Sequence, residues 1–65
     1  MELIINGERR TFANAATVAA LVGELDLCGR FAVEVNGEIV TRSRYPERHL
    51  APQDAVEIVR AIGGG

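Results

Sequence analysis

The residues of this 65-residue chain that could take part in chemistry are its last three, Gly63, Gly64 and Gly65. Glycine has no Cβ, so a run of glycines fits a channel too narrow for any side chain. Gly65 would also offer a terminal carboxylate. That group becomes electrophilic once an enzyme attaches AMP to it, and a sulfur nucleophile can then displace the AMP. The glycines therefore predict a chemical handle, with a merely disordered terminus or a cloning remnant as the alternative.

The rest of the chain brings together no catalytic set. There is one cysteine, Cys28, and one histidine, His49, which are too few for a Cys/His metal site. Neither a phosphate-binding GxxxxGKS loop nor a GxGxxG motif is present. We expect Cys28, near a helix exit, to be a half-buried structural thiol, with a reactive thiol as the alternative, and His49 to be a solvated loop residue. The chain is therefore predicted to be acted upon by an enzyme and not to be one.

Composition narrows the classes of partner. The net charge is −2 and the isoelectric point is about 5.2, which argues against general nucleic-acid binding. All seven basic residues are arginines, and there is no lysine. No stretch approaches the ~20 apolar residues of a membrane span, and no signal peptide is evident, so the cytoplasm is the expected compartment. In residues 42–49, Arg42, Arg44 and Arg48 surround Tyr45. They could dock an acidic partner, or they could form an ordinary solvated loop.

The glycines must be carried by a folded domain, and two Asn-Gly pairs in the sequence predict hairpin turns within it. Asn6-Gly7 joins strands at residues 2–6 and 8–12, and Asn36-Gly37 joins strands at 31–35 and 38–40. Between the hairpins, apolar residues recur at helical spacing from Val18 to Leu25, with Thr17 as the N-cap. Pro52 indicates a turn before a last strand, residues 56–61.

One helix must cover one sheet to bury both apolar faces. The order of hairpin, helix, hairpin and final strand predicts an α+β fold of the β-grasp, or ubiquitin-like, type with a mixed sheet of four or five strands. We expect a domain at residues 1–62 and a flexible tail at 63–65. Phe12 and Leu50 are further core candidates beside the main predicted core, which consists of Leu3, Ile5, Val18, Leu21, Val22, Leu25, Phe31, Val33, Val35, Val56 and Ile58.

The last strand also predicts a docking surface. Val59 lies on the strand face opposite Val56 and Ile58, so it is expected to be exposed close to the glycines. Ile62 would anchor the start of the tail. Gly63 and Gly64 would be recognised by their lack of side chains, and Gly65 would be modified.

Four segments together resemble the ThiS family of sulfur carrier proteins. They are INGE at 5–8, TVAALVGEL at 17–25, FAVEVNGEIVTRS at 31–43 and VEIVRAIGGG at 56–65. The resemblance covers essentially the whole chain, and the last strand with the terminal glycines is its most specific part. One departure is LAPQDAVEIV, since the family often has an Asp-Gly-Asp turn there. The departure concerns the local turn type and not the fold.

The resemblance implies a reaction cycle. A ThiF-like adenylating enzyme would use Mg-ATP to form an acyl-adenylate at Gly65, so no cofactor is expected on the chain itself. Sulfur from a cysteine-derived persulfide would convert the adenylate to a thiocarboxylate, and thiazole synthase (ThiG) would take up that sulfur. The alternatives are a carrier of the molybdopterin synthase small-subunit type, a ubiquitin-like protein modifier and a non-catalytic interaction module.

Overall fold

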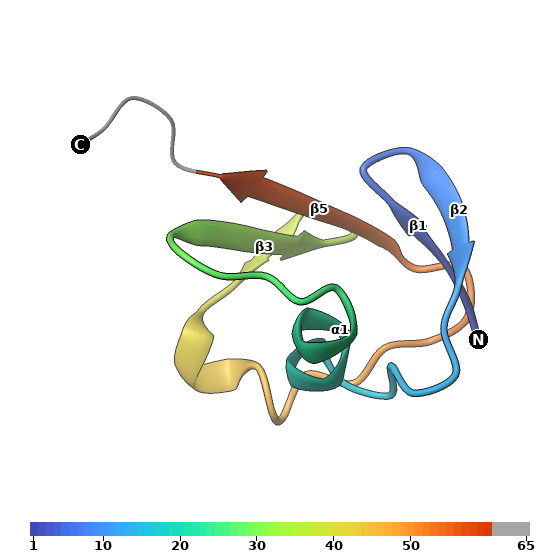
Figure 1. The fold of residues 1–65 in the computed structure, drawn as a ribbon, viewed down its shortest axis with the longest axis horizontal. Helices are drawn as coiled ribbons and strands as arrows, with labels where there is room; N and C mark the ends of the chain where they lie inside the picture. The colour runs from blue at the N-terminus through green and yellow to red at the C-terminus, as the bar shows by residue number, and fades with distance from the viewer. Residues whose placement is uncertain (61–65) are drawn as a thin grey trace.

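The computed structural model describes residues 1–60, and the predicted glycine tail lies outside that range. Figure 1 shows a curved sheet with a single short helix packed against one face. The elements in chain order are β1 (Glu2–Ile5), β2 (Glu8–Thr11), α1 (Val18–Glu24), β3 (Phe31–Val35), β4 (Glu38–Val40), the 3₁₀ helix η1 (Arg42–Arg44) and β5 (Ala55–Arg60).

The five strands form one mixed sheet in the order β2-β1-β5-β3-β4. Both Asn-Gly hairpins are antiparallel, as predicted, and β5 lies between them. It runs parallel to β1 and antiparallel to β3. This arrangement confirms the predicted β-grasp fold, with five strands in residues 1–60. The last strand of the chain is therefore the central strand of the sheet.

The turns have the backbone geometry that their residues favour. Asn6 and Gly7 have φ values of 49° and 84°, and Asn36 and Gly37 have 51° and 87°, so each pair makes the two-residue hairpin turn with positive φ at both positions. Before β5, Pro52 occupies the second position of a turn closed by the Asp54 N–H on the Ala51 carbonyl, at 3.2 Å. Gln53 follows Pro52 with φ of 72°, which gives a type II turn.

The start of α1 is capped from two directions. The Thr17 hydroxyl accepts from the Ala20 N–H at 3.1 Å, which confirms Thr17 as the N-cap. The carbonyls of Arg48 and Tyr45 accept from the N–H groups of Val18 and Ala19. First-turn N–H groups have no partner within a helix, so the loop before β5 supplies partners for two of them. No helix within residues 1–60 is long and apolar enough to cross a membrane.

The core lies between α1 and the sheet. Seven of the eleven predicted core residues are buried, and Val22, Leu25, Phe31 and Ile58 are partly buried against them. Phe12 and Leu50 are buried as predicted. The prediction did not include Ala15, Val40 and Tyr45, which are buried as well. Tyr45 stacks on Phe31 with 6.4 Å between the ring centroids.

Candidate functional site

The candidate site is the C-terminal end of β5, because this strand ends at Arg60 and the first glycine of the predicted handle, Gly63, follows three positions later in the sequence. Along one side, β5 is paired with β3 as far as Phe31 opposite Arg60. On the other side, its pairing with β1 ends at Ile5 opposite Val56. Residues 57–60 therefore extend past the end of β1. Of the predicted site residues, Val59 lies within the described structure, whereas Ile62, Gly63, Gly64 and Gly65 lie outside the described residues.

The side chain of Asn6 continues the pairing where β1 stops. The Asn6 backbone N–H donates to the Val56 carbonyl at 2.9 Å. Its side-chain Oδ1 then accepts from the Ile58 N–H at 2.7 Å, and its Nδ2 donates to the Ile58 carbonyl at 3.3 Å. The amide group thus makes the same pair of bonds with Ile58 that a peptide group of a neighbouring strand would make. This contact holds β5 two residues before the last described residue, Arg60.

Asn36 makes a related contact at the other end of β5. Its Oδ1 accepts from the Ala55 N–H at 2.9 Å, and its backbone N–H donates to the Ala55 carbonyl at 2.7 Å. Its Nδ2 donates to Asp54 at 3.1 Å. The asparagines of the two hairpin turns therefore hold opposite ends of the last strand, Asn36 at the start and Asn6 near the end.

The sheet face away from α1 carries exposed apolar side chains near this end. Val59 is 52% exposed, which confirms the predicted exposure, and it lies opposite Ala32 of β3. Ile39 of β4 is 73% exposed. Glu34 lies between β4 and β5, opposite both Ile39 and Glu57. We call Val59, Ala32, Ile39, Glu34 and Glu57 the outer-face patch.

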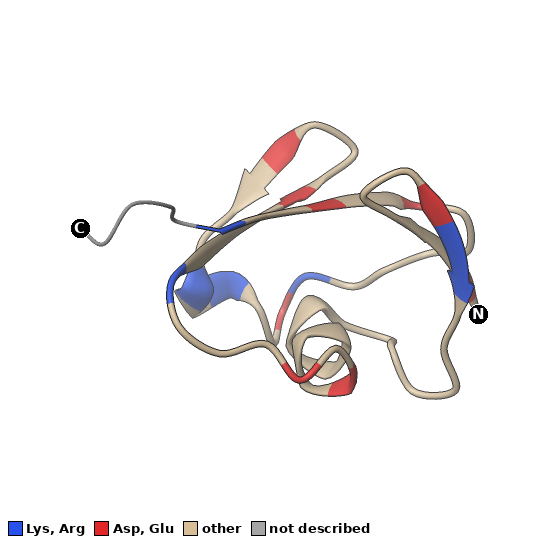
Figure 2. Ribbon diagram, turned by 45° about the horizontal axis from the view of Figure 1, so that its top comes forward, with Lys and Arg blue, Asp and Glu red and all other residues tan. Residues whose placement is uncertain are grey.

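The outer-face patch and the C-terminal end of β5 carry opposite charges. Figure 2 shows acidic positions along the strands and basic positions on β2, at the C-terminal end of β5 and in η1. Arg60 is the basic residue that ends β5. A partner that contacts the outer-face patch would therefore meet carboxylates next to Val59 and a guanidinium where the chain leaves the sheet.

A shallow groove lies beside the Asn6–Ile58 contact. Leu25 and Leu27, which follow α1, contribute its apolar wall, and Arg10 and Arg60 contribute charge. The Arg10 guanidinium lies over the Phe12 ring, 5.3 Å from its centroid. Arg10 is therefore held near the groove by a cation–π contact. The groove and the outer-face patch meet at Val59, which lines both.

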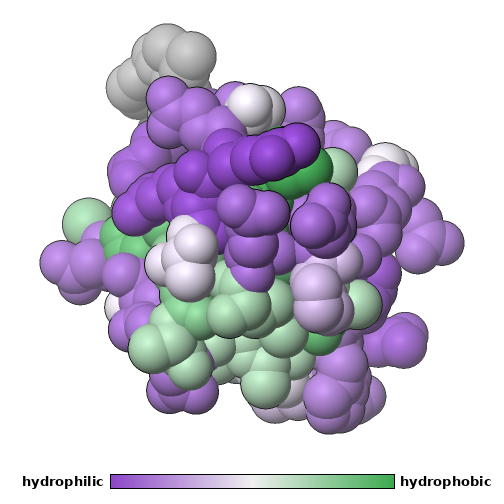
Figure 3. All heavy atoms as spheres, turned by 90° about the vertical axis from the view of Figure 1, so that its right-hand side faces the viewer, coloured by the Kyte–Doolittle hydropathy of each residue, from purple (hydrophilic) through white to green (hydrophobic). Residues whose placement is uncertain are grey.

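The β1–β2 side of the molecule offers less to a partner. Figure 3 shows that the upper half of this face is hydrophilic and that its lower half is mostly weakly hydrophobic. Among the described residues, the large hydrophobic side chains with the greatest exposure are Ile39 and Val59. The two most exposed large hydrophobic side chains of residues 1–60 thus both lie on the outer face of the sheet.

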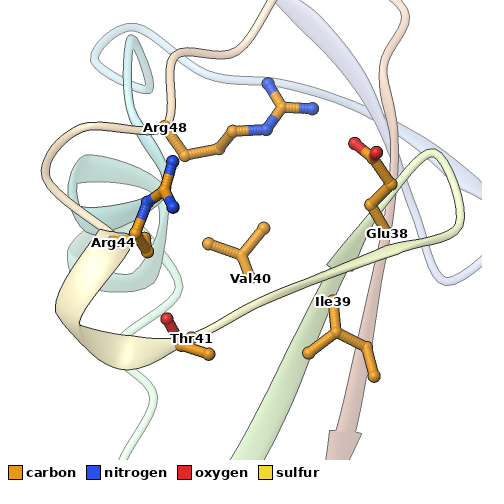
Figure 4. Close-up of a pocket in the computed structure, with 6 residues that line it drawn as sticks. All are labelled: Glu38, Ile39, Val40, Thr41, Arg44 and Arg48. Carbon is orange, nitrogen blue, oxygen red and sulfur yellow. The ribbon is translucent and has the colours of Figure 1, made fainter.

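The arginine loop is organised differently from the predicted cluster. The prediction placed Tyr45 among Arg42, Arg44 and Arg48, but Tyr45 is only 8% exposed and belongs to the core. Its ring is buried and stacks on the ring of Phe31, so Tyr45 is not available to a basic docking surface. Figure 4 shows the guanidinium groups of Arg44 and Arg48 and the Glu38 carboxylate around a shallow pocket, with Val40 between them. The arginines therefore border the free edge of β4.

The prediction that Cys28 is half-buried is wrong, because its side chain is exposed. The helix ends at Glu24, and Asp26 has a left-handed backbone with φ of 54°. Cys28 therefore lies in the irregular segment after the helix, with its side chain in solvent. His49 is exposed, as predicted, and its Nδ1 lies 3.1 Å from the Glu47 carbonyl oxygen. Residues 1–60 contain no group of three or more His, Cys, Asp or Glu side chains that could hold a metal ion.

Solved structures resemble the chain over its whole length. A crystal structure of a thiamine biosynthesis protein (ThiS) from Geobacter metallireducens has a TM-score of 0.83 and 32% identity, and each chain is covered completely. The solution structure of a thiamine biosynthesis protein from the same organism has a TM-score of 0.81 at 32% identity, with 88% of that chain covered. These similarities support the β-grasp assignment and point to one family.

Sequence comparison points to the same family as the solved structures. The chain is 50% identical over 66 aligned residues to a protein named thiazole synthase from Paramagnetospirillum magneticum. It spans 20% of the length of that curated relative. The model of the ThiS family matches residues 3–65, a range that includes β5 and the three glycines. The chain belongs to the ThiS family.

Proposed function

We propose that the chain is a sulfur carrier of thiamin biosynthesis and that it carries the sulfur as a thiocarboxylate on Gly65. The observation that carries this proposal is the family match over residues 3–65, because it includes the glycines themselves. The fold adds support, since the central strand β5 runs directly into that segment. In this account the chain is a protein substrate, and the catalytic groups belong to its partners.

The first step would be adenylation. A carboxylate oxygen of Gly65 attacks the α-phosphorus of ATP, and the bond from that phosphorus to pyrophosphate breaks. The products are an acyl-adenylate and pyrophosphate. The adenylating enzyme would bind Mg-ATP, so this chain needs to supply only the carboxylate and an unhindered approach. Glycines at 63 and 64 suit that approach because they carry no Cβ.

The second step would bring in sulfur. The terminal sulfur of a cysteine-derived persulfide attacks the acyl carbon, and AMP leaves with the bonding electron pair. The product is an acyl group joined to the donor through two sulfurs. A further thiol then attacks the donor sulfur by thiol–disulfide exchange, which releases the thiocarboxylate and leaves a disulfide on the donor side. Cys28 takes no part in this scheme.

The proposed partners are a ThiF-like adenylating enzyme and thiazole synthase (ThiG). Support for the second comes from the Paramagnetospirillum magneticum relative, which is named thiazole synthase and contains a segment 50% identical to this chain. Thiazole synthase would accept the sulfur from Gly65 and return the carboxylate. The chain would then be ready for another cycle.

We further propose that the outer-face patch docks the adenylating enzyme. Val59 supplies exposed apolar area next to the strand end, and Ile39 extends that area across the sheet. Glu34 lies between Ile39 and Glu57, and Glu57 is the next outer-face residue to Val59 along β5, so the two carboxylates would favour a partner surface with basic side chains. Ile62 is proposed to add an apolar anchor at the start of the tail.

The test of the proposed function is ATP–pyrophosphate exchange with the cognate adenylating enzyme. The complete chain should support exchange, because formation of the acyl-adenylate is reversible while pyrophosphate is present. A chain ending at Ile62 should not support exchange, although it keeps every described strand. Equal exchange by the two chains would exclude Gly65 as the reactive residue and favour a docking module.

A further inference from the structure

We propose that Asn6 is a positioning residue, which sets the direction in which β5 presents the C-terminal segment to the adenylating enzyme. This inference rests on the proposed function. It comes from the place of Asn6 in the sheet, at the point where β1 ends and β5 continues alone on that side. The Asn6 side chain holds the N–H and the carbonyl of Ile58 at 2.7 and 3.3 Å.

The end of β5 has few other restraints on this side. Its pairing with β1 consists of Ile4 with Ala55 and Ile5 with Val56. Beyond Val56, the edge of β5 on the β1 side bonds to the Asn6 side chain, through the N–H and the carbonyl of Ile58. On the opposite side, β3 holds residues up to Arg60, but pairing along one edge leaves a strand free to twist about that edge. Beyond Val56, the β1-side edge of β5 is therefore held by the side-chain amide of Asn6.

The geometry makes the far end sensitive to this contact. Gly65 is seven residues beyond Ile58. An extended segment of that length reaches up to ~24 Å, so while the enzyme holds it extended, a change of about 10° in direction at Ile58 would move the far end by about 4 Å. A reacting carboxylate must lie within a few tenths of an ångström to 1 Å of its productive position. Loss of the Asn6 amide should therefore lower the fraction of docked complexes that present Gly65 correctly.

Asn36 provides a matched control. It occupies the same position in the same kind of turn, with φ of 51° against 49° for Asn6. It also bonds through its side chain to the backbone of β5, but at Ala55. At Ala55 the strand is also paired with β1, and four residues lie between Ala55 and Arg60. Removing the Asn36 side chain should weaken the turn equally without changing the direction of the strand end.

The experiment compares Asn6→Gly with Asn36→Gly in the 65-residue chain. Glycine is compatible with positive φ, so both variants keep the hairpin turn and lose only the side-chain contacts. With the adenylating enzyme and ATP, Asn6→Gly should lower kcat for pyrophosphate exchange about 5- to 10-fold and leave KM within about 2-fold, because docking is intact and the competent fraction falls. Asn36→Gly should keep kcat within about 2-fold of the wild-type value.

Two further measurements separate positioning from general loss of structure. Amide hydrogen exchange at Ile58 should be faster in Asn6→Gly and unchanged in Asn36→Gly. Asn6→Asp keeps the acceptor for the Ile58 N–H but loses the Nδ2 donor, so its kcat should lie between those of the wild type and Asn6→Gly. Equal kcat for Asn6→Gly and Asn36→Gly would overturn the inference, as would a change confined to KM. Absence of exchange with the wild-type chain would instead overturn the proposed function.

Discussion

Glu34 of β3 and Glu57 of β5 lie directly opposite each other in the antiparallel register. Both are on the sheet face away from α1, where Glu57 is exposed and Glu34 is half-buried. Like charges directly opposite each other destabilise a sheet, typically by a few tenths of a kcal/mol. This pair therefore carries a cost in the free protein that a partner with basic side chains would relieve.

The first prediction follows from that pair. Glu57→Gln should raise the free energy of unfolding by about 0.2–1 kcal/mol, because it removes the repulsion and keeps the side-chain length. The gain should shrink in 1 M salt, which screens exposed charges. Urea denaturation of both proteins at low and high salt measures it. Glu8→Gln is the control, since exposed Glu8 lies opposite Ile5; an equal gain there would show that net charge and not the pair is responsible.

The second prediction concerns docking. Val59→Asp should raise the Kd for the adenylating enzyme at least about 10-fold, because it places a charge in an apolar contact. The fold should be retained, since Val59 is 52% exposed. Calorimetric titration gives the affinity, and thermal unfolding checks the fold. Ala13→Asp introduces the same charge at an exposed loop position away from the patch. Comparable losses for the two variants would contradict docking at Val59.

The third prediction tests the core. Leu21 is fully buried on α1, and Leu21→Ala should lower the free energy of unfolding by about 2–5 kcal/mol. Ile39→Ala removes a large side chain that is 73% exposed, and should change it by less than about 0.5 kcal/mol. Denaturation midpoints measure both changes. A loss below about 1 kcal/mol for Leu21→Ala would place the centre of the core elsewhere.

The fourth prediction uses the turn before β5. Gln53 has φ of 72°, a left-handed conformation that costs a non-glycine residue about 1–2 kcal/mol. Glycine avoids this cost but loses more entropy on folding, so Gln53→Gly should stabilise the protein by only several tenths of a kcal/mol. Gln53→Val should destabilise it, because a β-branched residue is least compatible with positive φ. Thermal unfolding should rank the residues Gly, Gln, Val; any other order would contradict the type II turn.

Local sequence patterns accounted for most of the fold. The Asn-Gly pairs, the spacing from Val18 to Leu25 and the alternation in 31–35 gave the elements, because turn chemistry and periodicity act between near neighbours. The exposure of Val59 also followed from strand alternation. Strand order did not follow, since the pairing of β5 with β1 joins residues as distant in the sequence as Ile4 and Ala55, and no local pattern specifies it.

The failures have a common physical cause. Tyr45 stands among arginines in an irregular loop, and its burial depends on Phe31 and on the bond from Ala19 to its carbonyl. The Asn6 side chain bonds to a residue 52 positions away. Contacts of this kind leave no periodic signal along the chain.

The most direct test of the account is the intact mass of the chain after incubation with ATP, the cognate adenylating enzyme, a cysteine-derived persulfide source and a thiol. Replacement of one carboxylate oxygen by sulfur should add about 16 Da, and fragmentation should place the added mass on Gly65. A chain ending at Ile62 should gain nothing under the same conditions. An unchanged mass of the complete chain, or an equal gain by the chain ending at Ile62, would contradict the sulfur-carrier function at Gly65.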